Sequence, residues 1–206
     1  MQRFIRFCVC CAAAFMAVSI ALVVLYRFVP VRLTPLMVMR KAEAFGRGEQ
    51  LTFRHEWVPL ERISPDMISA VIESEDAHFY DHGGFSFGDM LDAFYRNKRS
   101  GCIVAGGSTI SQQTAKNVFC TPSRTYTRKL FEAYFTVLIE LLWGKQRILE
   151  VYLNVIELGD GVFGVESAAD EYFSTSALRL NSHQSAALTD IIPCPRCYTD
   201  WLYGIE

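Results

Sequence analysis

The sequence predicts a mainly α-helical domain that is preceded by one transmembrane helix. An uncharged apolar run covers residues 7–26. Through most of the remaining chain, apolar residues recur at helical spacing behind helix-capping signals. No alternation of strand and helix patterns indicates a parallel sheet. With 206 residues, the chain has room for one domain and an accessory segment.

The apolar run is predicted to be a retained membrane anchor, because about 20 helical residues span a hydrocarbon core of about 30 Å. Arg3 and Arg6 precede the run and favour a cytoplasmic N-terminus, although Arg27 and Arg32 beyond it reduce this bias. A cleaved signal peptide is the alternative, but the run ends without a small-residue cleavage site. We therefore expect the rest of the chain to lie outside the cytoplasm.

Three segments are expected: a cytoplasmic stub with the anchor at 1–28, a linker at 29–50 and a folded domain at 51–206. Within the domain, residues 51–58 alternate as a strand does, and Ser64-Pro65-Asp66 is a helix start. A glycine-rich turn is expected at 159–164, and the 128–143 helix is apolar over a wide arc that predicts burial. Further helices are expected at 89–96, after a cap at Ser108, and at 146–154, 165–173 and 182–192.

Composition excludes some classes of function. The formal net charge is −2, so no global basic field indicates nucleic-acid binding. Cys8, Cys10 and Cys11 lie in the anchor as small apolar residues. Of the cysteines beyond it, Cys194-Pro195-Arg196-Cys197 fits a redox pair, half a metal site or a disulfide, and a structural role is favoured because no second Cys-x-x-Cys motif completes a zinc site. The pairing of Cys102, Cys120, Cys194 and Cys197 is left open by the sequence.

Two glutamates are candidate catalytic residues. Glu75 ends an apolar helical run, where partial burial can raise the pKa of a carboxyl group into the range useful for proton transfer near neutral pH. Glu132 is the second, since glycosidic chemistry commonly uses a pair of carboxylates. The structural alternatives are a solvated helix end for Glu75 and an ion pair with Arg128, one helical turn earlier, for Glu132.

A cluster of cations predicts a polyanionic ligand. Lys116, Arg124, Arg128 and Lys129 lie close together in the sequence, and the last two open a long helix whose N-terminus already carries partial positive charge. Gly106-Gly107-Ser108-Thr109 precedes another helix and offers backbone N–H groups as a phosphate cradle, although the P-loop lysine is missing. A solvated basic face is the alternative interpretation.

Other chemistries are disfavoured. Glu75-x-x-His78 resembles half of a di-metal motif, but the sequence has no second copy. Ser108 and Ser111 have no neighbouring histidine base, which argues against a serine hydrolase. No protein-bound metal site is predicted.

Five sequence blocks, in order, resemble the peptidoglycan glycosyltransferase family, most closely its monofunctional, membrane-anchored biosynthetic transglycosylases. The blocks span about residues 60–195 and are Glu75-Asp76-Ala77-His78-Phe79-Tyr80-Asp81-His82-Gly83-Gly84, Gly107-Ser108-Thr109-Ile110-Ser111-Gln112-Gln113 with Lys116-Asn117, Arg128-Lys129-Leu130-Phe131-Glu132, residues 145–154, and Gly159-Asp160-Gly161-Val162-Phe163-Gly164 through Ala169. Ser86 departs from the family, which often has Asp there, and altered local hydrogen bonding is expected.

The resemblance implies a lysozyme-like helical fold with a head lobe and a membrane-facing jaw, and makes 51–206 the glycosyltransferase domain. It implies polymerisation of lipid II, with Glu75 as the general base, inversion at the anomeric carbon and release of undecaprenyl diphosphate. Glu132 and the four cations would hold the diphosphate, together with an optional divalent cation, Mg²⁺ or Mn²⁺. The remaining residues implied at the substrate site are Ser108, Thr109, Gln112, Gln113 and Asn154.

The implied partners are lipid II, nascent glycan and membrane lipids, with cell-wall synthesis or division proteins as further candidates and no nucleic acid. The implied location is the bacterial inner membrane, with the domain in the periplasm. The chain has no room for a transpeptidase domain, so glycan would be polymerised without cross-linking. Two alternatives stay open: a lysozyme-like glycan-cleaving enzyme, which needs no diphosphate site, and an inactive membrane-anchored glycan-binding or scaffold module.

Overall fold

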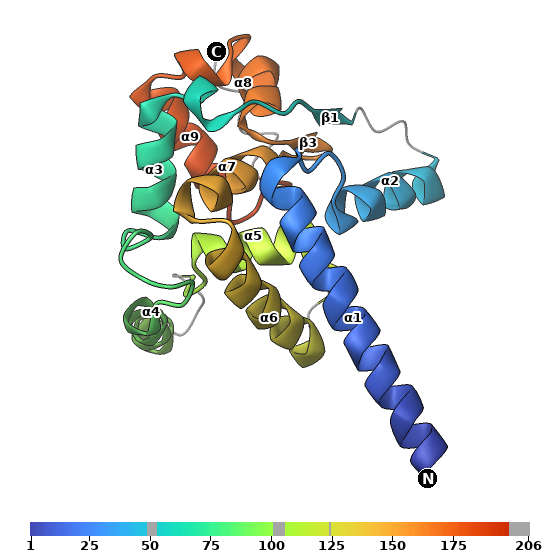
Figure 1. The fold of residues 1–206 in the computed structure, drawn as a ribbon. Helices are drawn as coiled ribbons and strands as arrows, with labels where there is room; N and C mark the ends of the chain where they lie inside the picture. Colours follow the sequence, from blue (N-terminus) through green and yellow to red (C-terminus); the bar gives the residue numbers. More distant parts are fainter. Residues whose placement is uncertain (49–52, 101–105, 124, 198–206) are drawn as a thin grey trace.

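The fold is mainly helical, as predicted, and a computed structural model describes residues 1–48, 53–100, 106–123 and 125–197 (Figure 1). The α-helices are α1 (Gln2–Phe28), α2 (Pro35–Arg47), α3 (Pro65–Glu75), α4 (Phe87–Ser100), α5 (Ile110–Phe119), α6 (Tyr126–Leu142), α7 (Lys145–Val155), α8 (Val165–Phe173) and α9 (Ser182–Ile191). The short elements are the 3-10 turns η1 (Leu60–Arg62) and η2 (Ala177–Arg179) and the strands β1 (Arg54–His55), β2 (Glu157–Gly159) and β3 (Val162–Phe163).

Helix α5 is the centre of the domain and packs closely against both α6 and α7. Ile110 and Ala115 of α5 are fully buried, and so are the hydroxyl-bearing Ser111 and Thr114. Small and apolar side chains allow neighbouring helices to approach closely. The two helices that flank α5 therefore hold it rigidly, and with it any side chain that α5 directs into a cavity.

A small sheet with the order β1-β3-β2 ties the start of the domain to its second half. β1 is parallel to β3, with Arg54 opposite Val162, and β2 is antiparallel to β3. The segment predicted as a glycine-rich turn thus contains a hairpin. Of the strand expected at 51–58, only Arg54–His55 is a strand, and residues 51 and 52 lie outside the described residues.

Most predicted helices are confirmed with shifts at their ends. α3 starts at Pro65 behind the cap Ser64, and α8 covers the expected 165–173. The cap of α5 is Thr109 and not Ser108. The expected linker contains a helix of its own, α2, in which Met37 is fully buried.

The expectation that the 128–143 helix is largely buried is confirmed on one side of the helix only. Leu130 and Leu141 of α6 are 72% and 75% exposed, and Phe131 and Val137 are also exposed. One face of α6 packs on α5, and Phe131 and Tyr134 contact Phe15 of α1, whereas Leu130, Val137 and Leu141 remain exposed. Apolar side chains over a wide arc are typical both of buried helices and of helices at a lipid surface, and the pattern alone does not separate the two.

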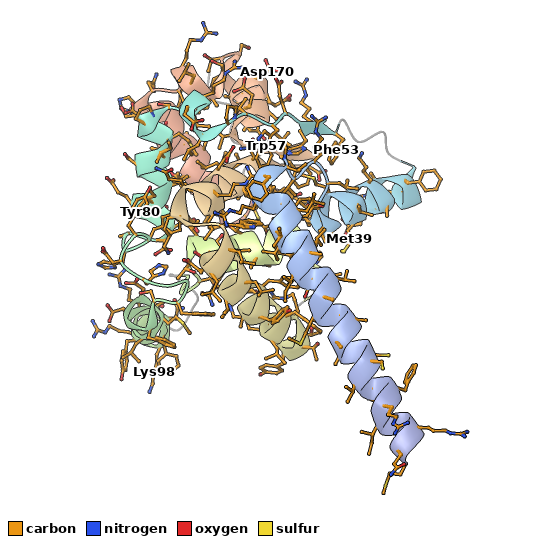
Figure 2. All side chains as sticks on the ribbon, in the orientation of Figure 1. Met39, Phe53, Trp57, Tyr80, Lys98 and Asp170 are labelled. Carbon is orange, nitrogen blue, oxygen red and sulfur yellow. A yellow bond between two sulfur atoms is a disulfide. The ribbon has the colours of Figure 1, made fainter. Side chains whose placement is uncertain are left out.

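Helix α1 is long and apolar enough to cross a membrane, and its N-terminal half projects beyond the rest of the fold (Figures 1 and 2). Its C-terminal half docks on the domain. The Trp143 indole N–H donates to the carbonyl of Val23 at 2.7 Å, and the Arg147 guanidinium donates to the carbonyls of Tyr26 and Val29, each at 2.7 Å. Arg147 thereby binds carbonyls at the C-terminal end of α1, where intrahelical partners run out.

Candidate active site

Glu75 is the last residue of α3, and its half-buried side chain faces α5. The Gln113 amide Nε2 donates a hydrogen bond to Glu75 Oε2 at 2.6 Å, and the Tyr152 hydroxyl donates to Gln113 Oε1 at 3.3 Å. Burial raises the pKa of Glu75, an effect that the Gln113 hydrogen bond and the charge of Lys116 oppose. The Tyr152 contact fixes which end of the Gln113 amide faces the carboxylate.

The loop after Glu75 is held by an Asp76–His82 pair. His82 Nε2 lies 2.9 Å from Asp76 Oδ1, and the backbone N–H of Gly84 donates to His82 Nδ1 at 3.0 Å. Because Nδ1 accepts a hydrogen bond, this network assigns the proton of the imidazole to Nε2, which donates to Asp76. Gly84 has φ +93°, and a Cβ there would lie 2.8 Å from Thr136 Cγ2, so glycine is required at this turn.

The N-terminus of α5 is already occupied. Thr109 and Gln112 form a capping box, in which each side chain accepts a hydrogen bond from the backbone N–H of the other residue. Asp76 Oδ2 accepts the N–H of Ile110 at 2.9 Å. The predicted phosphate cradle therefore holds a carboxylate of the protein itself at that N–H, and Thr109 and Gln112 act first as helix caps.

Three of the predicted cations meet around Glu132. This carboxylate is only 2% exposed and forms ion pairs with Arg128 and Lys129. Burial lowers the pKa of the Lys116 ammonium, and the charges of Glu132 and Glu75 act in the opposite direction. Lys116 and Arg128 line one cavity with Gln113, the hydrogen-bond partner of Glu75, so the two candidate carboxylates adjoin one site.

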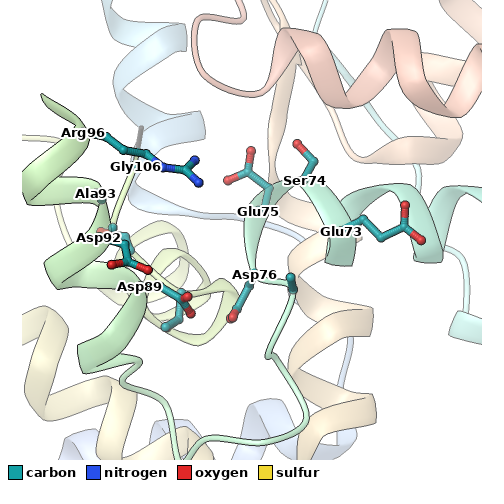
Figure 3. Close-up of a pocket in the computed structure, with 13 residues that line it drawn as sticks. Glu73, Ser74, Glu75, Asp76, Asp89, Asp92, Ala93, Arg96 and Gly106 are labelled. Carbon is teal, nitrogen blue, oxygen red and sulfur yellow. The ribbon is translucent and has the colours of Figure 1, made fainter. Parts of the chain in front are cut away.

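Two cavities adjoin Glu75 and Lys116. The first, of about 310 Å³, is lined by Glu75, Ser108 and Thr109 together with Arg96 of α4, whose guanidinium points toward Glu75 in Figure 3. The second, of about 410 Å³, is lined by Gln113, Lys116, Arg128 and other residues. Gln113 connects the two, because it lines the second cavity and hydrogen-bonds to the carboxylate that lines the first.

Lys129, Ser108 and Ser86 complete the contacts around the first cavity. Lys129 Nζ lies 3.5 Å from Ser108 Oγ, and the Ser86 hydroxyl donates to Asp89, another residue of the lining. This hydrogen bond lowers the pKa of Asp89. The Ser86–Asp89 hydrogen bond therefore occurs at the position where the family often has Asp.

Asn154 lies outside both cavities. It is 1% exposed, its Oδ1 accepts the N–H of Val58 at 2.9 Å, and its Nδ2 donates to the carbonyls of Val58 and Glu150. All of its polar atoms are used in holding the segment before η1 against α7. The described geometry gives Asn154 a structural role, and Arg124 lies outside the described residues.

No group of three or more His, Cys, Asp or Glu side chains within the described ranges is placed to hold a metal ion. Among the residues predicted to bind the diphosphate, Glu132 is the carboxylate that could bind a metal ion. Its charge is already neutralised by ion pairs with two cations. This donor set does not fit a divalent cation held by the protein. Cys194 and Cys197 form a disulfide, whereas Cys120 is free and buried, which raises the pKa of its thiol to about 11.

Sequence reasoning missed Tyr152, Asp76 and Arg96. One signal for Tyr152 was available, since a tyrosine on a helix that is otherwise buried usually has a hydroxyl partner. Asp76 and His82 belong to the first sequence block, but no spacing rule pairs them with each other and with the start of α5. Arg96 reaches the cavity only through the position of α4.

Comparison with known proteins shows the family to which the chain belongs. The family model described as Transglycosylase matches residues 43–203. The chain is 53% identical over 173 residues to the biosynthetic peptidoglycan transglycosylase of Caulobacter vibrioides, covering 84% of this chain and 72% of that protein. It is 46% identical over 199 residues to the protein of the same name from Chromohalobacter salexigens, covering 95% and 83%. The chain therefore belongs to the transglycosylase family.

Proposed function

We propose that this chain is a peptidoglycan glycosyltransferase that polymerises lipid II into glycan strands and releases undecaprenyl diphosphate. Family membership supports the reaction class. The observation that carries the proposal is one cavity lined by Gln113, Lys116 and Arg128, in which Gln113 hydrogen-bonds to Glu75 and Arg128 forms an ion pair with Glu132. A base and a cationic pocket in one site are what the transfer of a sugar from a diphosphate requires.

In the proposed mechanism, the Glu75 carboxylate takes the proton of the 4-hydroxyl group of the acceptor sugar. The acceptor oxygen forms a bond to the anomeric carbon of the donor, on the face opposite the leaving group. The bond from that carbon to the diphosphate oxygen breaks, and its electron pair leaves with the lipid diphosphate. The raised pKa of Glu75 suits this role, because a general base works best when its pKa lies near the working pH.

The cations stabilise the leaving diphosphate. Lys116 and Arg128 line the same cavity, and Glu132 holds Arg128 and Lys129 in place. Fixed positive charges in a partly buried site stabilise charge that develops in the transition state without reorganising solvent. Gln113 keeps Glu75 beside this cavity, which supports assigning the proton acceptor and the leaving-group pocket to one reaction.

We extend the proposal to location, with α1 as an inner-membrane anchor and the domain in the periplasm. The candidate span supports the anchor, and Arg3 and Arg6 support a cytoplasmic N-terminus. A lipid-linked substrate stays in the bilayer, so an anchored enzyme keeps its site at the surface where the substrate is. Protease protection of a C-terminal tag in spheroplasts tests the orientation: the proposal requires the tag to be cleaved from outside.

The activity test uses the purified full chain with labelled lipid II in detergent. Long glycan strands from the wild type, absent with Glu75→Gln, are the expected result. Cleavage of preformed glycan without polymer would assign the chain to the lysozyme-like hydrolases instead. If neither reaction occurs, the chain is an inactive glycan-binding or scaffold module. The partly buried cations favour transfer, because hydrolysis of a glycan involves no diphosphate.

A further inference from the structure

Helix α2 has an apolar outer face, which the mechanism above does not use. Val38, Met39, Ala42 and Phe45 recur at helical spacing and form this face, and all of them are exposed, Phe45 to 87%. A helix on the surface of a domain normally directs its polar residues to solvent and its apolar residues to the core. The amphipathic pattern of α2 is therefore the reverse of the usual one, and its outer face is a surface suited to an apolar environment.

Charged side chains of α2 contact the domain instead. Arg40 forms a bidentate ion pair with Glu157, at 2.7 and 2.9 Å, and the Lys41 ammonium lies 4.0 Å from the centre of the Phe53 ring. Met37 is on the same side of the helix and is fully buried. These contacts fix the rotation of α2 about its own axis, so the fold itself holds the apolar face outward.

The position of α2 relative to α1 indicates what that environment is. Only residues 29–34 separate α2 from the end of the candidate membrane span, and α2 runs across the direction of α1 (Figure 1). A helix that runs across a membrane span lies along the plane of the membrane. Met39 is on the side of α2 that faces the N-terminal half of α1 (Figure 2). If α1 spans the bilayer, the outer face is therefore at the boundary between head groups and acyl chains.

The charges around α2 fit an anionic lipid surface. Arg27 and Arg32 precede the helix and Arg47 ends it, and all three are exposed. Residues 27–48 contain one acidic residue, Glu43, which forms an ion pair with Arg40. Basic residues beside a membrane span are attracted to anionic lipid head groups, and an amphipathic helix in the interface combines such residues with an apolar face. This combination favours a phospholipid surface over a second protein as the occupant.

We propose that α2 lies in the surface of the membrane, with its outer face among acyl chains and its flanking basic residues among anionic phospholipid head groups. The inference rests on the proposed function, which includes α1 as a membrane anchor. Leu36 and Arg40 of α2 also line the cationic cavity that contains Lys116 and Arg128. The membrane-bound helix is thus one wall of the cavity assigned to the diphosphate, and it holds that cavity at the depth of the lipid head groups.

Photo-crosslinking tests the membrane contact without relying on catalysis. The full chain carrying Phe45→benzoylphenylalanine is placed in nanodiscs of phosphatidylethanolamine and radiolabelled phosphatidylglycerol. Position 45 is expected to acquire the lipid label. Asp170→benzoylphenylalanine is the control and should acquire none, since Asp170 is exposed at the end of the domain remote from the N-terminus of α1 (Figure 2). Labelling of position 45 no stronger than that of position 170, or crosslinking only to a second copy of the chain, would overturn the proposal.

Kinetics with Phe45→Asp provide a second test, because the variant places a charge on the outer face at an exposed position where the fold tolerates it. In bilayers the KM for lipid II should rise about fivefold, as expected for losing part of the burial of one aromatic side chain. In detergent the KM should stay near wild type, because there is no membrane plane to set the height of the cavity. Ser69→Asp, exposed on α3 on the other side of the domain, is the control (Figure 1). Equal KM changes in bilayers and in detergent would contradict the membrane role of α2.

The two tests also separate this inference from the proposed function. If the wild type forms no glycan but position 45 acquires the lipid label, the membrane contact of α2 stands and the proposed function fails. If the wild type forms glycan but position 45 acquires no label, the proposed function stands and the membrane contact fails.

Discussion

The two glutamates of the site are surrounded in opposite ways. Glu75 accepts a hydrogen bond from a neutral amide, and burial raises its pKa. Glu132 is more deeply buried, but it forms ion pairs with Arg128 and Lys129. A carboxylate without an ion pair can take up a proton at little cost, whereas one between two cations serves to hold them. The difference separates proton transfer from charge organisation within one site.

The two surroundings also differ in how they arise from the sequence. The partners of Glu132 lie four and three residues earlier on the same helix. Gln113 comes from another helix, 38 residues after Glu75, and Tyr152 lies a further 39 residues along the chain. The Glu132 cluster therefore needs little more than α6 to form, whereas the Glu75 environment requires the packing of α3, α5 and α7.

The largest expected effect comes from Glu75→Gln, which removes the proton acceptor. We expect glycan polymerisation to fall about 10³-fold, within the usual contribution of a general base. The circular dichroism spectrum should be unchanged. Glu73→Gln is the matched control: Glu73 is exposed, lies on the same helix and points away from Glu75 (Figure 3). Wild-type rates in Glu75→Gln would show that Glu75 is not the proton acceptor.

Glu75→Gln should also change how the stability of the protein depends on pH. Because burial raises the pKa of Glu75 above that of the unfolded chain, its favourable contribution is complete below about pH 4.3 and is lost as pH rises through the folded pKa. The Tm of Glu75→Gln should therefore rise relative to wild type as pH increases over this range. A Tm difference that does not vary with pH would mean that burial does not penalise the charged form of Glu75.

The second largest effect is expected from Glu132→Gln, which leaves Arg128 and Lys129 without their common anion. Removing one member of a buried ion pair costs about 3 kcal/mol of stability, and polymerisation should fall with it as the cations lose their positions. Thermal unfolding of the variant measures the cost. Glu61→Gln, at an exposed position, is the control and should change Tm little. Equal Tm values for the two variants would show that the ion pairs contribute nothing.

The helices of this fold differ in how far their contacts lie along the sequence, and this affects which of them the sequence predicts. α3 was predicted well because its cap Ser64 and its apolar stripe are local, and α8 because it follows a glycine turn and has a local apolar stripe. Helix α2 was missed although its signals are local, with Thr34 as the cap and Pro35 at the first position. Only its docking is remote, since Arg40 forms a bidentate ion pair with Glu157, 117 residues away. The exposure of α6 was missed for a different reason, since an apolar arc does not state whether protein or lipid covers it.

In the candidate site too, a contact between residues close in sequence was foreseen, whereas contacts between distant residues were not. The Arg128–Glu132 pair was foreseen as an alternative because i, i+4 spacing is sufficient to place it. The phosphate cradle before α5 was expected from its glycines, but Asp76 takes the Ile110 N–H, and that contact depends on the tertiary path of the loop. For the same reason, Asn154 was expected in the pocket although its polar atoms hold Val58.

A smaller effect is expected from Lys116→Ala, which tests whether the two glutamates share a substrate. A charge-assisted hydrogen bond contributes about 1.5–3 kcal/mol, so the KM for lipid II should rise about tenfold or more. Inhibition by lipids that mimic the diphosphate should weaken in parallel. Lys98→Ala, on α4, is the control. Unchanged kinetics in Lys116→Ala would remove Lys116 from the site and break the link between Glu75 and Glu132.

The smallest effect concerns Tyr152→Phe, which removes the hydroxyl that orients Gln113. Glu75 acts in its ionised form, so kcat/KM should rise with pH until Glu75 is deprotonated. The Gln113 hydrogen bond lowers the pKa of Glu75, and a misoriented amide would no longer do so. We therefore expect the ascending limb of the pH profile to move to higher pH, with rates a few-fold lower on the acid side and near wild type on the alkaline plateau.

Tyr172→Phe separates this positioning role from a general loss of packing. Its hydroxyl donates to the carbonyl of Leu158 at 2.9 Å, so the substitution also removes one hydrogen bond from a tyrosine. Both variants should lose a similar amount of stability, about 1 kcal/mol. Only Tyr152→Phe should move the limb, because only Tyr152 is bonded to the partner of Glu75. A uniform decrease at every pH would assign Tyr152 to packing and leave the protonation of Glu75 controlled by burial alone.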